Sequence, residues 1–335
     1  MTDAHQAPAG SARRRRVAVV GAGPAGLEAA RRCADAGDAV DVFEKSRGIG
    51  GRVATRRARA EDGSGADLAF DHGAPAFRPR SPFLRAHFDT LAAAGAAVRA
   101  TPPFEGYIGV PSMTALFRAL ADGLDIAFET RVERLERLDD GRWRLSTAAT
   151  ARGAPPVDEA AWTARGPYDA VVIAVPGPQA RALAGAHAAP EIAAAMDAAT
   201  YAPQLTLMLA VPAGARGWGD GPAARVWEDG PLALAFRNDL RPGRPGEHVQ
   251  WVAQASAAFT GAHLEDPADA VADRMHAVLA DALGADASAR PAYRRAHRWR
   301  YSRTTHPVPY PDERSAPRSL SFAGDWLGAP GARRD

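Results

Sequence analysis

The sequence predicts an α/β protein with a discontinuous, Rossmann-like nucleotide-binding domain and a second, α+β domain built on an antiparallel sheet. Three observations lead to this fold class. The apolar run Val17–Val20 enters a helix through a glycine turn, which is typical of the first strand of a parallel sheet. The apolar segment Tyr168–Pro176 is typical of a buried parallel strand that ends at a proline. Four strands with meander-like spacing, at 206–211, 224–227, 232–237 and 248–256, favour the antiparallel sheet.

The remaining elements follow from helical spacing and turn residues. Pro82 and Gly95 bound a predicted helix over 83–94, and a second helix covers 113–121. Predicted strands at 125–130, 132–138 and 142–146 add to the nucleotide-binding domain, with a hairpin turn at 139–141. A weaker strand is expected near 160–164, a helix over 266–283, and a last short strand over 319–323.

Composition fits a soluble two-domain protein. The chain has 335 residues, of which 46% are hydrophobic, and this is enough for two cores. A net charge of +2 and the lack of a basic stripe with interleaved aromatics argue against a nucleic-acid partner. No apolar run approaches the roughly 20 residues that cross a membrane. We therefore expect a cytoplasmic protein that acts on a small molecule, with residues 1–12 as a disordered tail.

The glycine turn after Val20 predicts a binding site for an adenine dinucleotide. Gly21 permits the turn, Gly23 lets the backbone approach a pyrophosphate, and Gly26 lets the helix pack closely on the strand. The helix begins near Pro24, so Pro24 and Ala25 lie where free N–H groups and the positive helix end face phosphates.

Glu44 ends the second strand a little over twenty residues after Gly21, where a carboxylate can accept hydrogen bonds from both ribose hydroxyls. Lys45 follows it at the same edge. In the next loop, Gly50 and Gly51 can lay backbone N–H groups along the dinucleotide while Arg52 neutralises a phosphate. The alternative for this loop is a solvated basic segment. The fingerprint alone does not separate FAD from NAD.

A late Gly324-Asp325 pair favours FAD. Asp325 follows the strand at 319–323, and all parallel strands of such a sheet end at one crevice. The aspartate can therefore reach the ribityl or phosphate region of an extended FAD, with Trp326 close to the isoalloxazine ring. The alternative for Asp325 is an ordinary turn residue.

The order of these motifs resembles the flavin-dependent amine-oxidase superfamily, and within it most closely the renalase-like oxidases of bacteria. The resemblance rests on GAGPAG, a strand ending in FEK, GxGGR and FDHGAxxF, and continues through 107–113, 251–256, 297–301 and 322–326. It implies noncovalent FAD. Cys33, the single cysteine, lies near neither Asp325 nor the FDHGA turn at 70–74, which argues against a thioether link to the flavin. The resemblance adds further cofactor contacts from three places in the sequence: His72, Gly73 and Ala74; Val132; and Gly324 and Trp326 beside Asp325.

The resemblance also implies a reaction, in which 2- or 6-dihydro isomers of NAD(P)H are oxidised to NAD(P)+ and O2 gives hydrogen peroxide. Such a hydride transfer needs no general base. We place His72, Tyr107 and Trp299 at the reacting centre, whereas Trp251 is better explained as core. The alternative for His72 is a structural histidine that is hydrogen-bonded beside the turn. Arg298 and Arg300 either hold substrate phosphates or form a solvated strand face, and we favour the second reading. No metal-ligand cluster or Ser-His-Asp order suggests another mechanism.

We expect residues 14–78, 105–178 and 316–335 to form the FAD-binding domain, and residues 79–104 and 179–315 to form the substrate domain. The sequence leaves the oligomeric state open. Only eleven residues follow Gly324, which leaves no room for the final helix of the resembling family. Two alternatives therefore stay open: a flavin amine oxidase or desaturase with another small-molecule substrate, and a noncatalytic homologue with a degenerate C-terminus.

Overall fold

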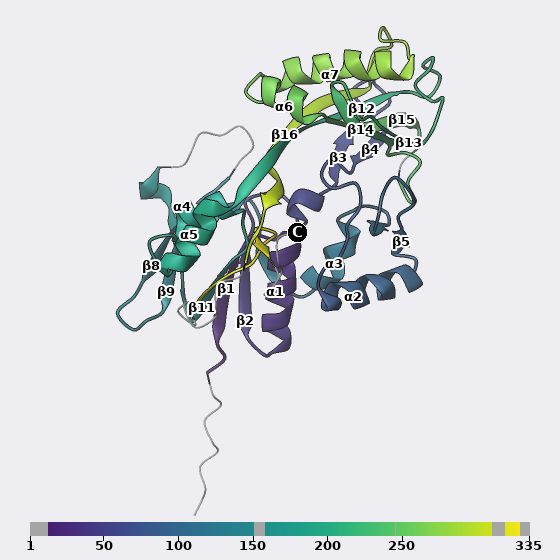
Figure 1. The fold of residues 1–335 in the computed structure, drawn as a ribbon. Helices are drawn as coiled ribbons and strands as arrows, with labels where there is room; N and C mark the ends of the chain where they lie inside the picture. The colour runs from purple at the N-terminus through teal and green to yellow at the C-terminus, as the bar shows by residue number, and fades with distance from the viewer. Residues whose placement is uncertain (1–12, 151–157, 245, 310–318, 329–335) are drawn as a thin grey trace, which may run out of the picture.

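The computed structural model describes residues 13–150, 158–244, 246–309 and 319–328 (Figure 1). The predicted tail at 1–12 lies outside these residues. A five-stranded parallel sheet has the order β18-β11-β1-β2-β7. Its strands come from three separate parts of the chain, which confirms the discontinuous Rossmann-like domain. The strands are β1 (Arg16–Val20), β2 (Ala39–Phe43), β7 (Asp125–Ala127), β11 (Ala170–Ile173) and β18 (Leu320–Phe322).

Helix α1 (Pro24–Asp35) makes the crossover from β1 to β2 and begins at the predicted proline. Its Leu27 and Ala30 are fully buried against the sheet. Strand β1 lies in the centre, because Val17 pairs with Val40 of β2 on one side and with Ala170 of β11 on the other. The glycine turn at the carboxyl end of β1 therefore opens at the middle of the sheet edge.

The predicted strand at 168–176 is confirmed as a parallel strand of this sheet but is shorter, since β11 covers 170–173 and pairs with β1 and β18. Strand β10 (Thr163–Tyr168) ends one residue before β11 begins, and it belongs to a three-stranded antiparallel sheet with β8 (Thr130–Arg137) and β9 (Trp143–Ala149). The break falls at Asp169, whose carboxylate accepts a hydrogen bond from the Arg16 backbone N–H at 2.7 Å. Helices α4 (Gly177–Ala184) and α5 (Pro190–Ala198) pack into the same core as this small sheet.

The second large sheet is antiparallel, as predicted, in the order β13-β14-β15-β12-β16. Helices α6 (Ala257–His263) and α7 (Ala268–Leu283) lie along it in Figure 1, and Trp251 is fully buried in the core that this sheet forms with α7. A hairpin of β3 (Arg56–Arg59) and β4 (Asp67–Phe70) contributes to a further core with Met208 and Val252. The five strands are β12 (Thr200–Pro212), β13 (Ala224–Val226), β14 (Leu232–Arg237), β15 (His248–Ala255) and β16 (Tyr293–His306).

Helix α2 packs with the parallel-sheet unit. Its Phe88 shares a core with Val19 of β1, Leu27 of α1 and Phe117 of α3. This packing differs from the predicted boundary, which placed residues 79–104 in the substrate domain; the rest of that division stays a prediction. The elements here are α2 (Pro82–Ala93), β5 (Ala97–Arg99), β6 (Tyr107–Gly109) and α3 (Ala115–Ala121). Among the described residues, no helix is both long and apolar enough to cross a membrane.

Candidate active site

A cavity of about 2630 Å³ opens at the carboxyl ends of the parallel strands. The GAGPAG turn, the loop at 45–57, β16 and Gly324-Asp325 all contribute to its lining, so both large sheets border it. Pockets for drug-sized ligands usually measure about 300–1,000 Å³. The space is therefore sufficient for an extended dinucleotide together with a second molecule.

The three glycines of the fingerprint have distinct surroundings. Gly21 has a φ of 104°, which makes the tight turn. A Cβ on Gly26 would lie 1.9 Å from the carbonyl oxygen of Gly21, so this glycine allows α1 to approach the strand, and it does not line the cavity. A Cβ on Gly23 would meet no protein atom within 4 Å. The open space at Gly23 therefore fits a phosphate group above the first turn of α1.

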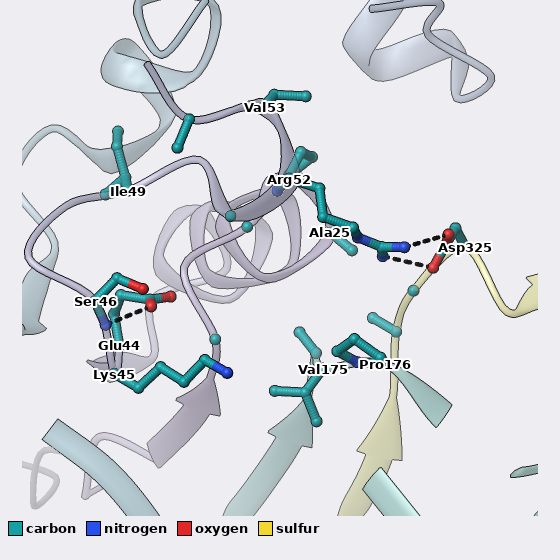
Figure 2. A pocket seen from close by; sticks show the side chains of 18 of the residues that line it. Ala25, Glu44, Lys45, Ser46, Ile49, Arg52, Val53, Val175, Pro176 and Asp325 are labelled. Carbon is teal, nitrogen blue, oxygen red and sulfur yellow. Dashed lines mark hydrogen bonds and ion pairs between the residues drawn. The ribbon is translucent and has the colours of Figure 1, made fainter. Parts of the chain in front are cut away.

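Glu44 is held by two backbone groups. Its Oε2 accepts a hydrogen bond from Ala22 N at 2.8 Å. Its Oε1 accepts one from Ser46 N at 2.7 Å, which Figure 2 shows. The side chain is only 6% exposed but lines the cavity, as do Lys45 and Val132. Since each carboxylate oxygen can accept more than one hydrogen bond, the fixed carboxylate retains capacity for ribose hydroxyls.

The GGR loop is fastened on both sides. Gly50, with a φ of 106°, donates its N–H to Ala22 O at 2.8 Å, and Ala74 N donates to Arg52 O at 2.9 Å. A Cβ on Gly73 would lie 2.0 Å from that Arg52 oxygen. Gly50 and Gly73 do not line the cavity, whereas Gly51 and Ala74 do. The loop and the FDHGA turn therefore form one continuous wall.

Arg52 and Asp325 bind each other across the cavity wall (Figure 2). Arg52 Nη1 donates to Asp325 Oδ2 at 2.7 Å, and Nη2 donates to Oδ1 at 2.6 Å. Burial alone would raise the pKa of Asp325, but the hydrogen bond and charge of Arg52 and a hydrogen bond from Thr304 outweigh it and lower that pKa. The sequence prediction gave each residue its own separate contact with the cofactor and did not anticipate this pair.

Two histidines and a tryptophan form an aromatic cluster on the wall nearest the antiparallel sheet. The His72 ring centroid lies 5.0 Å from those of His297 and Trp299, and the last two are 4.2 Å apart. Burial, the charge of His297 and the charge of Arg56 lower the pKa of His72 to about 3, so this imidazole is neutral at physiological pH. The sequence analysis missed His297, although it lies two residues before Trp299 on a predicted strand segment and so shares a face with it.

Arg298 and Arg300 are paired with Glu265. Arg300 donates to both carboxylate oxygens, at 2.7 and 2.8 Å, and Arg298 donates to one of them at 3.3 Å. Arg298 also donates to the backbone oxygen of Asp266 at 2.6 Å. These contacts favour the reading in which the two arginines support the strand face.

Tyr107 and Trp326 do not line the cavity, although the sequence analysis placed both near the flavin. Tyr107 is 1% exposed, packs against Phe88 and donates its hydroxyl hydrogen to Asp89. Trp326 is fully buried, and its Nε1 donates to Val175 O at 3.2 Å. Both side chains fill cores of the parallel-sheet unit, so we no longer assign them to the site.

A buried ionic cluster anchors the turn that carries His72, and the sequence analysis did not find it. Asp71, fully buried, accepts hydrogen bonds from Arg244 at 2.5 Å and Arg241 at 3.1 Å. It also accepts one from the Thr55 hydroxyl at 2.6 Å. Burial raises the pKa of Asp71, but the two arginine charges lower it further, so the carboxylate stays ionised. The cluster joins the GGR loop, the FDHGA turn and the β14–β15 loop.

A glycine fingerprint on a parallel sheet, beside a large cavity that an antiparallel sheet also borders, indicates a dinucleotide-binding protein. Residues 19–91 match the family of NAD(P)-binding Rossmann-like domains. Residues 91–332 match the family described as flavin containing amine oxidoreductase. This second match spans most of the chain, and the chain therefore belongs to that family.

Solved structures of similar fold agree. A protein assigned as a protoporphyrinogen oxidase from Exiguobacterium sp. 255-15 superimposes with a TM-score of 0.66 at 14% identity, over 95% of each chain. Putrescine oxidase gives a TM-score of 0.54 at 14% identity, over 93% of each chain. Reduced UDP-galactopyranose mutase gives 0.57 at 11% identity, over 86% of this chain and 83% of its own. At these identities the likeness concerns the fold alone.

The protein is thus a FAD-dependent oxidoreductase, and its residues fit the cofactor. The open space at Gly23 suits the pyrophosphate, and the fixed carboxylate of Glu44 suits the adenosine ribose. The guanidinium of Arg52 suits a cofactor phosphate. FAD, when bound, supplies an acceptor for hydride and passes electrons on to an oxidant. The described residues contain no group of His, Cys, Asp and Glu that could hold a metal ion.

Proposed function

We propose that this protein is a renalase-like oxidase that removes hydride from a dihydronicotinamide isomer, 2- or 6-dihydro-NAD(P), to give NAD(P)+, with O2 reduced to hydrogen peroxide. The observation that carries the proposal is the cluster of His72, His297 and Trp299 on the cavity wall, in which the His72 imidazole is uncharged.

A dihydropyridine ring suits this cluster for two reasons. Loss of hydride turns it into an aromatic cation, so no residue has to act as a general base. A flat ring can also stack on the indole of Trp299. The neutral imidazole of His72 can exchange hydrogen bonds with a carboxamide without placing a positive charge beside the developing pyridinium. These residues would therefore bind and orient the substrate and exclude water, while FAD receives the hydride.

The charge of the cavity supports an anionic substrate. Basic side chains outnumber acidic ones along its lining. Arg57 and Arg303 line it without an ion pair to any part of the chain that the structure describes. An excess of positive charge in a cleft raises the local concentration of anions. A dinucleotide with two phosphates would gain from this field, whereas a cationic amine would be repelled by it.

Anaerobic mixing of the FAD-loaded protein with each compound tests the proposal. We expect 6-dihydro-NAD or 2-dihydro-NAD to bleach the visible flavin band rapidly, whereas NADH and putrescine leave it largely unchanged. Admission of O2 should then restore the band and release one hydrogen peroxide per NAD+ formed. Bleaching by the amine and by neither isomer would instead make this protein an amine oxidase.

A further inference from the structure

Strand β16 of the antiparallel sheet reaches the ion pair between Arg52 and Asp325. The hydroxyl of Thr304, near the end of this strand, donates to Asp325 Oδ2 at 2.5 Å. The same oxygen accepts the hydrogen bond from Arg52 Nη1 at 2.7 Å. One carboxylate oxygen is therefore shared by a side chain from each unit of the fold.

The backbone of β16 contacts the same guanidinium. Arg52 Nη1 lies 3.3 Å from Tyr301 O and 3.4 Å from Ser302 O. The Arg52 side chain is still 31% exposed, and both it and Thr304 line the cavity. A guanidinium is planar and has five N–H donors in a fixed fork. Once Asp325 engages two of them, the plane is set and the direction of the remaining donors is fixed.

We infer that Thr304 is a positioning residue of the FAD site. By holding Asp325 Oδ2, its hydroxyl sets the orientation of the carboxylate, and the carboxylate in turn sets the plane of the Arg52 guanidinium that faces a cofactor phosphate. Thr304 itself need not touch FAD. The inference rests on the FAD site and is independent of the proposed dihydronicotinamide substrate.

The consequence is that the affinity for FAD depends on a residue of the antiparallel sheet, which does not carry the dinucleotide fingerprint. Thr304 lies on the same strand as His297 and Trp299, so β16 carries both the aromatic cluster and the group that orients Arg52. A change at the Thr304 hydroxyl should therefore alter FAD binding without any change in the dinucleotide fingerprint.

Titration of the apoprotein with FAD, followed by the quenching of flavin fluorescence, measures the effect directly. We expect Thr304→Val to raise the Kd for FAD about tenfold, which is the lower end of the range expected for the loss of a hydrogen bond to a charged group. Thr304→Ser keeps the hydroxyl and should restore the wild-type Kd. Thr200→Val is the matched control, because its hydroxyl bonds to Thr305 and His306 at the neighbouring strand end. It should leave the Kd unchanged.

A double-mutant cycle separates positioning from general stability. Lysine at position 52 keeps the charge but lacks the fork. If Thr304 acts through the Arg52 fork, Thr304→Val should have little further effect on the Kd in the Arg52→Lys background. Equal effects in both backgrounds, or a wild-type Kd for Thr304→Val, would overturn the inference. The Tm of each apoprotein reports folding, and Thr304→Ala replaces the valine variant if that variant does not fold.

Discussion

The indole Nε1 of Trp299 donates a hydrogen bond of 3.0 Å to the backbone oxygen of His72. This bond joins β16 to the turn after β4, and it holds the two rings 5.0 Å apart with an interplanar angle of 36°. The wall proposed to receive the substrate ring is therefore set by two segments that are far apart in sequence.

Trp299→Phe tests the importance of this bond. Phenylalanine keeps an aromatic face but has no N–H donor, so β16 and the turn lose their direct connection at the wall. We expect anaerobic reduction of the flavin by 6-dihydro-NAD to slow about three- to tenfold, the range for loss of one neutral hydrogen bond. Stopped-flow absorbance measures the rate. Trp227→Phe is the control, because Trp227 is partly buried against the core of the antiparallel sheet and does not line the cavity. Equal rates for the Trp299 variant and wild type would contradict the role.

The depressed pKa of His72 predicts a specific acid sensitivity. The imidazole has a pKa of about 3 in the folded protein against an ordinary value of 6.5. Between these values the unfolded chain binds a proton that the folded protein excludes. The contribution of His72 to the free energy of unfolding is therefore fully present above pH 6.5 and is lost as the pH drops. At pH 5 this group alone should cost about 2 kcal/mol.

Urea unfolding of wild type and His72→Gln at pH 7 and pH 5 measures that cost. Glutamine does not titrate, so the variant should lose about 2 kcal/mol less stability than wild type between the two pH values. An equal loss in both proteins would show that His72 accepts a proton freely in the folded state. It would also remove the argument that a neutral imidazole faces the substrate ring.

Two glycines of the fingerprint should respond differently to alanine. At Gly26 the added Cβ would lie 1.9 Å from Gly21 O, so α1 must shift, and we expect the apoprotein to lose about 1–3 kcal/mol. At Gly23 the Cβ meets nothing, and the φ of −77° suits alanine. Gly23→Ala should therefore leave the apoprotein Tm nearly unchanged.

The same alanine at Gly23 should weaken FAD binding about tenfold or more, because the methyl group fills space that the pyrophosphate requires. Thermal unfolding of the apoprotein and fluorescence titration with FAD give the two readings. If Gly23→Ala binds FAD normally, the phosphates do not lie above this turn, and the assignment of the first turn of α1 to the cofactor would be wrong.

These examples show which parts of the site the sequence could predict. The roles of Gly21 and Gly26 depend on backbone conformation within one turn, and a short motif contains all the information that they need. The β1, α1 and β2 order follows from an apolar run, a helix start and a second apolar run. The strand predicted at 168–176 is part of the parallel sheet as β11, but it begins only at Ala170; Asp169 before it accepts a hydrogen bond from Arg16, more than 150 residues earlier, and no local pattern indicates such a contact.

The positions of Tyr107 and Trp326 could not be predicted for a related reason. Tyr107 and Trp326 stand in motifs beside the cavity, but whether such a side chain faces the cavity or the core depends on what packs behind it. Asp71 stands next to His72 in the sequence, yet Arg241 and Arg244 approach it only once the two sheets meet. Contacts of this kind have no local sequence signal, and only the folded structure shows them.

The ionic cluster gives the sharpest stability prediction. Asp71→Asn leaves two buried guanidinium groups beside a neutral amide, and loss of one partner from a buried ion pair costs about 3–5 kcal/mol. Since Asp71 also fixes Thr55 and the turn before His72, the remaining folded protein should bind FAD more weakly.

Urea unfolding of the apoprotein measures the stability. The exposed pair of Arg142 and Asp140 provides the control, and Asp140→Asn should not move the unfolding midpoint. If Asp71→Asn unfolds at the wild-type midpoint, the arginines have found another partner, and the cluster does not anchor the His72 turn.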